Sequence, residues 1–167
     1  MDIQQFTRYE NVLMGKEPNL SESERNAPPL RDLKWDDVLK GYLALARDKG
    51  DLEALKRALF LAWYYQADPE WVTGIGSLDP KTTREVLRLA NDRARKGQLD
   101  SELIWMLPYF YAIVEWYLAT EDDALRKISM ENRYLWMTAC LESSFDNRGQ
   151  MGEYWKSILN NQKTRVD

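Results

Sequence analysis

The residue best placed for chemistry in this chain is Glu115, a carboxylate within a weakly charged stretch, residues 103–120, that is crowded with aromatic side chains. A charged group among side chains that must leave water costs free energy unless it is paired or protonated. Such a carboxyl is a candidate centre for a ligand pocket or an active site. We expect Glu115 to be buried and matched by a donor. The alternatives are a place in a solvent-connected site and ordinary exposure.

Several rings could form the walls of a pocket around this carboxylate. Two of these rings, Trp116 and Tyr117, follow Glu115 directly in the sequence, and two more, Trp63 and Tyr64, belong to an earlier helical segment. Trp71 lies outside any clear helical stripe and is a candidate anchor for a partner. The candidate ligand-binding or partner-binding residues are Trp63, Tyr64, Trp71, Glu115, Trp116 and Tyr117. None of them is assigned a catalytic role.

The composition excludes most familiar catalytic machinery. With no histidine and one cysteine, Cys140, the chain has no Ser-His-Asp or Cys-His pair, no histidine haem ligand and no Glu-x-x-His metal motif. The acidic pairs Asp36-Asp37 and Asp122-Asp123 stand where helices should begin, which favours capping over metal binding. We therefore expect no cofactor and no metal, and an enzyme is less favoured than a binding protein.

Two further segments have a functional and a plain interpretation. Residues 73–77 (TGIGS) resemble a phosphate loop only superficially, since they lack the lysine and glycine spacing of a nucleotide fingerprint, and a tight connection is favoured. The helix expected after Pro80 is locally basic. A solvated face is the simpler interpretation of its cations, and a patch for an acidic partner is the sharper one. These cations are Lys81, Arg84, Arg88, Arg93, Arg95 and Lys96.

Length and charge describe one domain. A chain of 167 residues with 44% hydrophobic and 30% charged residues can enclose a core. The net charge of −4 argues against general nucleic-acid binding and suits a basic partner better. A lone cysteine and a polar, charged opening segment predict a cytoplasmic protein. Pro108, Glu115 and scattered rings favour a buried helix over a membrane span for residues 103–120.

Helical periodicity and helical stop signals recur along the chain, and alternating strand patterns do not. Asp51 and Asp79 are expected to cap helices, and a further helix is expected after Asp100 and Ser101. Gly50 and Gly97 are expected to end helices. Residues 16–31, which are polar and contain three prolines, predict an extended crossing or loop. The sequence predicts an all-α fold: a compact multihelical domain over residues 1–167, built from stacked αα-hairpins.

A weak internal similarity offers an alternative to this compact arrangement. Residues 46–55 (ARDKGDLEAL) resemble residues 94–103 (ARKGQLDSEL), and their glycines are separated by about the length of a two-helix repeat. A short helical-repeat array is therefore the second architecture that the sequence allows.

The sequence indicates a function only through the kinds of surface that its helices can present. Aromatic and charged helical faces suit a non-enzymatic protein-interaction module, such as an adaptor, an inhibitor or an immunity-like partner, with a protein partner or a second copy bound to it. The alternative is a small-molecule-binding protein or unfamiliar enzyme with an aromatic pocket around Glu115.

Overall fold

The computed structural model describes residues 1–118, 123–138 and 144–163. These residues form helices and their connections and contain no strand, which confirms the all-α class. Asp122 and Cys140 lie outside the described residues. The elements are α1 (Ile3–Leu13), α2 (Glu22–Arg25), the 3-10 helix η1 (Leu30–Asp32), α3 (Trp35–Asp48), α4 (Leu52–Ala67), α5 (Glu70–Thr73), α6 (Pro80–Arg95), α7 (Ser101–Ile113), α8 (Glu115–Leu118), α9 (Ala124–Glu131), α10 (Leu135–Thr138) and α11 (Gly149–Lys163).

Aspartates cap helix starts: Asp51 and Asp79, as predicted, and also Asp100. The Asp51 and Asp100 carboxylates accept hydrogen bonds from backbone N–H groups three residues ahead, at 3.0 and 2.9 Å, and Asp79 accepts from Lys81 at 3.0 Å. Each bond satisfies an N–H that has no partner inside the helix. Asp36 and Asp37 also lie in the first turn of α3, as expected.

Gly50 and Gly97 both adopt the left-handed conformation, with φ of +69° and +64°. Glycine reaches this region without a steric penalty, so both residues end helices as predicted. The packing around the two segments nevertheless differs. Helix α3 packs closely on α4, whereas α6 packs mainly on α3, α4 and α9.

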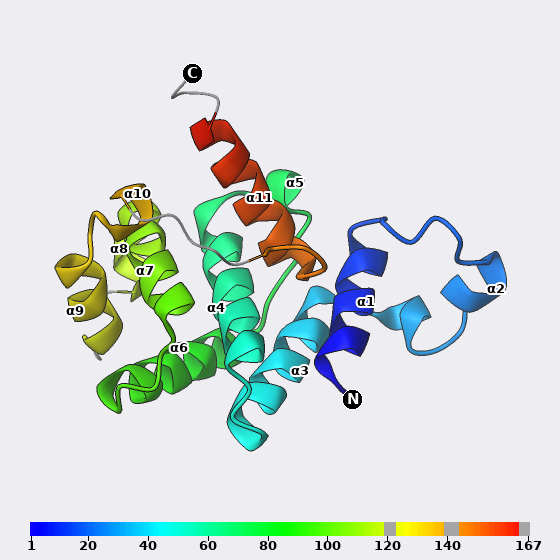
Figure 1. Cartoon of the computed structure of the whole chain (residues 1–167). Coiled ribbons are helices and arrows are strands. Elements are labelled where there is room, and N and C mark those ends of the chain that lie inside the picture. Colours follow the sequence, from blue (N-terminus) through cyan, green and yellow to red (C-terminus); the bar gives the residue numbers. More distant parts are fainter. Residues whose placement is uncertain (119–122, 139–143, 164–167) are drawn as a thin grey trace.

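Helix α4 is the centre of the molecule (Figure 1). Every residue from 54 to 64 is buried, and α3, α6, α7 and α11 all pack against it. Helix α7 supplies the second buried surface, with Leu103, Trp105, Met106 and Phe110 in the core. No helix among the described residues is both long and apolar enough to cross a membrane.

Residues 16–31 are not uniformly extended, because they contain the single-turn helix α2. A reciprocal capping box forms this turn: the Glu24 N–H donates to the Ser21 hydroxyl, and the Ser21 N–H donates to the Glu24 carboxylate. The polar sequence that predicts a loop also contains this local helix signal.

Candidate functional site

The residues predicted to bind a ligand or partner fall into two separate environments. Trp63 is completely buried on α4, where its indole N–H donates to the Phe110 carbonyl oxygen at 3.0 Å. Tyr64 stacks beside it, with ring centroids 6.0 Å apart, and burial raises the pKa of its hydroxyl. A completely buried indole cannot line a solvent-accessible site, so Trp63 belongs to the core.

The expected burial of Glu115 is wrong. Helix α7 passes through Pro108 and ends at Ile113, and Val114, with φ −135° and ψ 72°, leaves the helical conformation. The helix expected to bury Glu115 therefore ends before it reaches this residue. This carboxylate is exposed and accepts a hydrogen bond from the Tyr111 hydroxyl at 2.7 Å.

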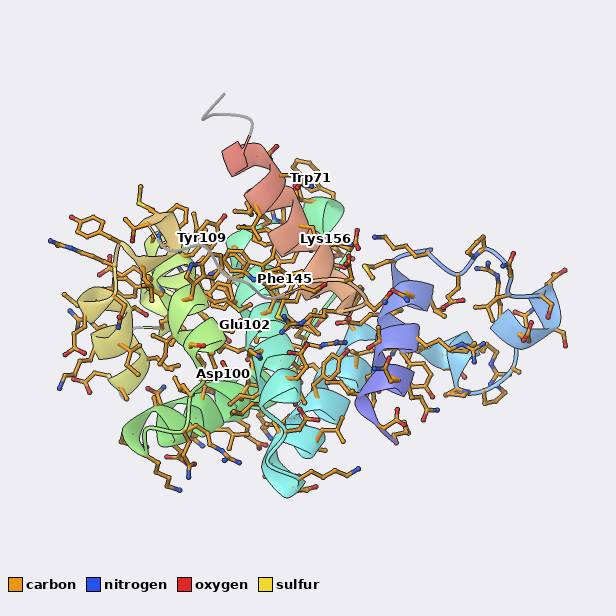
Figure 2. The ribbon with its side chains drawn as sticks, viewed as in Figure 1. Trp71, Asp100, Glu102, Tyr109, Phe145 and Lys156 are labelled. Atoms are coloured by element: carbon orange, nitrogen blue, oxygen red, sulfur yellow. The ribbon has the colours of Figure 1, made fainter. Side chains whose placement is uncertain are left out.

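The same break divides the two rings that follow. Tyr117 is buried, and this burial raises the pKa of its hydroxyl, which has no hydrogen-bond partner among the described residues. Trp116 remains 64% exposed. Trp71, on α5, is more exposed still, at 86%, and lies at the periphery of the molecule (Figure 2). Among the described residues, the rings expected beside Glu115 are thus divided between the core and the surface, and two tryptophans, Trp71 and Trp116, remain in solvent.

Trp116 belongs to a wider set of exposed apolar side chains on elements that pack around α7. Helices α8, α9 and α10 all lie beside α7 (Figure 1). Between half and two thirds of each side chain in this set is accessible to solvent. We call it the α8–α10 surface; its members are Ile113, Trp116, Met130, Tyr134 and Met137.

The α8–α10 surface rests on a fixed base. Leu125 of α9 is buried, and its N–H donates to the Asn91 side chain of α6 at 3.0 Å. The Ser129 hydroxyl donates to the Leu125 carbonyl oxygen at 2.8 Å. Helix α9, which carries Met130, is thus packed and hydrogen-bonded on its inner side.

Sequence reasoning missed most of this surface. Met130, Tyr134 and Met137 lie on short helices or turns, where periodicity over a few residues does not distinguish a buried face from an exposed one. The available signal was the number of large apolar residues following residue 113, which exceeds what the short helices α8 to α10 can bury. Arg133 adds a cation above the Tyr134 ring, 4.7 Å from its centroid.

A second feature is a polar hollow of about 470 Å³ at the junction of α4, α7 and the start of α11. Lys56 and Arg148 form its centre. The Lys56 ammonium lies 2.9 Å from Asp100 and 2.8 Å from Glu102, and Arg148 forks between Glu53 and Glu102. Figure 2 shows Asp100 and Glu102 at the start of α7.

These charges neutralise one another. Burial disfavours the Lys56 ammonium, but the Glu102 and Asp100 carboxylates outweigh it and raise its pKa. The Arg148 pKa is raised in the same way, because Glu102 and Glu53 offset its burial. Arg57, the third cation, pairs with Glu53 at 2.8 Å. The cations of the hollow are thus engaged within the protein, which is the arrangement of a structural clamp.

Glu10 lies close to this clamp and is fully buried. One carboxyl oxygen accepts a hydrogen bond from the Gln150 N–H at 3.2 Å, and the other has no hydrogen-bond partner in the part of the chain that the structure describes. Burial raises the pKa of Glu10 to about 8, although nearby Arg57 opposes the shift. Glu10 is therefore mainly protonated at neutral pH.

Within the described ranges, no group of three or more acidic, cysteine or histidine side chains could hold a metal ion. Comparison with known protein families, with curated proteins and with solved structures gives no match to this chain.

Proposed function

We propose that this protein is a non-enzymatic helical interaction module that binds a protein partner through the α8–α10 surface. The supporting observation is the exposure of Trp116, Tyr134 and Met137 together with Ile113 and Met130 on neighbouring elements. Large exposed apolar residues that gather on one part of a surface are characteristic of protein contacts. Tryptophan and tyrosine are enriched among residues that dominate binding energy. An adaptor, an inhibitor and an immunity-like partner all fit this role.

The alternative of a small-molecule pocket around Glu115 has less support. Glu115 is exposed, and the rings expected to enclose it are divided between the core and the surface. The polar hollow does not replace it, because Lys56, Arg57 and Arg148 already pair with carboxylates.

Site-specific photo-crosslinking tests the proposal. A photoreactive phenylalanine derivative at position 116 or 137 should form cross-links to a defined peptide of a partner or of a second copy of the chain. The control position is Asn19, which is exposed in the loop before α2. This loop and helices α8 to α10 lie on opposite sides of the view in Figure 1.

The identified partner is then purified and titrated against variants. Trp116→Ser and Met137→Ser should weaken its binding by about 30-fold if these residues carry the contact. Their thermal stability should stay close to that of the wild type, because both side chains are largely in solvent. Equal cross-linking at positions 116, 137 and 19, with the chain monomeric in sedimentation experiments, would contradict the proposal.

A further inference from the structure

The outer face of α6 carries a row of three cations. Lys81, Arg84 and Arg88 are separated by three and four residues, so they lie on one side of the helix. All three are exposed, and the opposite side of α6, including Val86, Leu87 and Ala90, is buried. At 1.5 Å of rise per residue, the row is about 10 Å long.

The acids closest to this row on the same helix interact with other cations. Asp92 pairs with Arg95 at 2.5 Å, and Glu85 lies 4.0 Å from Arg47 of α3. Lys81, Arg84 and Arg88 form no ion pair with any residue that the structure describes. Their charges therefore face solvent and are not held in an ion pair within the described part of the chain.

The row also contrasts with the charge of the whole chain. Helix α6 and the lysine that follows it hold six cationic residues and two acidic ones, whereas the net charge of the protein is −4. A concentration of one sign on an otherwise oppositely charged protein gives a local potential that steers partners to that face.

The face is presented on a fixed scaffold. Asn91 is fully buried on the inner side of α6, where its amide donates to the Leu87 carbonyl oxygen at 3.1 Å and accepts from the Leu125 N–H at 3.0 Å. Helices α3, α4 and α9 pack against α6. Little backbone ordering is then required when a partner binds, which lowers the entropic cost of association.

We propose that Lys81, Arg84 and Arg88 dock an acidic helix of a partner protein. Carboxylates at positions i, i+3 or i+4, and i+7 of such a helix match the length of the row. A duplex nucleic acid fits less well: the three cations neutralise few phosphates, Glu85 and Asp92 border the row, and the remaining acidic surface repels a polyanion.

Fluorescence anisotropy with a labelled peptide of repeated Glu-Ala-Ala-Glu units, about four helical turns long, tests this docking. The wild type should bind the peptide at low ionic strength and lose affinity at about 0.15 M salt, where exposed charges are screened beyond roughly 8 Å. The double variant Arg84→Glu/Arg88→Glu should bind at least about tenfold more weakly. Circular dichroism should show an unchanged fold, because both side chains are exposed.

The matched control is Arg8→Glu/Lys34→Glu, which changes the net charge equally at exposed positions on α1 and before α3. It should retain the wild-type affinity. The proposal is overturned if the peptide does not bind the wild type, if both double variants lose affinity equally, or if a DNA duplex of similar charge binds more tightly than the peptide. Trp116→Ser should bind the peptide normally, which separates this test from that of the α8–α10 surface.

Discussion

Helix α11 is attached to the rest of the molecule in two physically different ways. Its middle is held by rings: Trp155 lies 4.9 Å from Trp105 and 5.0 Å from Tyr109, measured between ring centroids. Its first turn is held by charge and hydrogen bonds, through Arg148 and Gln150.

The two attachments differ in what they demand of their neighbours. Apolar packing is non-directional and tolerates some rearrangement of volume, so the ring cluster can lose detail while still excluding water. A buried ion pair stabilises only while every member is present, because a remaining unpaired charge is costly. The charged and hydrogen-bonded contacts at the start of α11 therefore fix the position of the helix. The ring packing at its middle supplies most of the free energy that the helix gains from burial.

The largest expected effect is at the ring attachment. Trp155→Ala should reduce the free energy of unfolding by about 4 kcal/mol, because it leaves a cavity among several buried rings. Chemical denaturation measures this loss. Trp155→Phe should cost much less, since it keeps a ring and removes an indole N–H that has no hydrogen-bond partner. Equal losses in the two variants would mean that ring volume is not what holds α11.

Disrupting the charged attachment should have the next largest effect on the free energy of unfolding. Arg148→Met is expected to cost about 3 kcal/mol, because Glu53 and Glu102 lose the cation that joins them. The loss should be nearly independent of salt, since partly buried pairs are weakly screened. Lys156→Met is the control, as that lysine pairs with Glu153 at the surface and should have a much smaller effect. A strong salt dependence of the Arg148 effect would show that the clamp is open to solvent.

Glu10 predicts a pH dependence at the same end of α11. Its pKa is raised from 4.5 to about 8 in the folded protein, so the folded state binds one proton more than the unfolded state between these values. Stability from this group is highest at acidic pH and declines as pH rises through the window. Between pH 7 and pH 9 the decline should be about 1.4 kcal/mol.

Thermal unfolding of Glu10→Gln at both pH values isolates this contribution. The amide keeps the size of the side chain and an acceptor for the Gln150 N–H, but it does not titrate. The variant should therefore lose less stability than the wild type on going from pH 7 to pH 9. Parallel decline of both proteins would place the Glu10 pKa near its ordinary value.

The smallest expected effect is a refinement of the ring attachment. The hydroxyl groups of Tyr109 and Tyr154 lie 2.7 Å apart and share a hydrogen bond. Tyr154→Phe removes it and should cost about 1 kcal/mol in the free energy of unfolding. Tyr65→Phe, at a half-buried position, provides a comparison. If Tyr154→Phe lost as much free energy of unfolding as Trp155→Ala, the ring contacts of α11 would also depend on this hydrogen bond.

Local signals in the sequence predicted local structure well. The caps at Asp51 and Asp79 and the left-handed stops at Gly50 and Gly97 depend on a few adjacent residues, so they could be found without knowing the fold. The all-α class follows from the repetition of such signals.

The candidate site could not be predicted in this way. The position of Glu115 was extrapolated from a helical period that stops at Val114, and one non-helical residue is enough to turn the following side chains to another face. The clamp at Arg148 joins residues 95 and 46 positions away in the sequence, a separation for which periodicity carries no information. The cations of α6 were visible in the sequence, but that Lys81, Arg84 and Arg88 form no ion pair with any described residue could be seen only with the neighbouring helices in place.

The contact between Glu10 and Gln150 has a consequence for the synthesis of the protein. These residues are separated by 140 positions, and the first helix is translated long before its hydrogen-bond partner exists. Until α11 leaves the ribosome, the parts of α1, α4 and α7 that it covers stay exposed, and the Glu10 carboxyl group lacks the Gln150 N–H that binds it in the interior. The chain therefore completes this part of its interior only after α11 has been synthesised, and nascent chains that stop before residue 149 expose the rings that pack against Trp155.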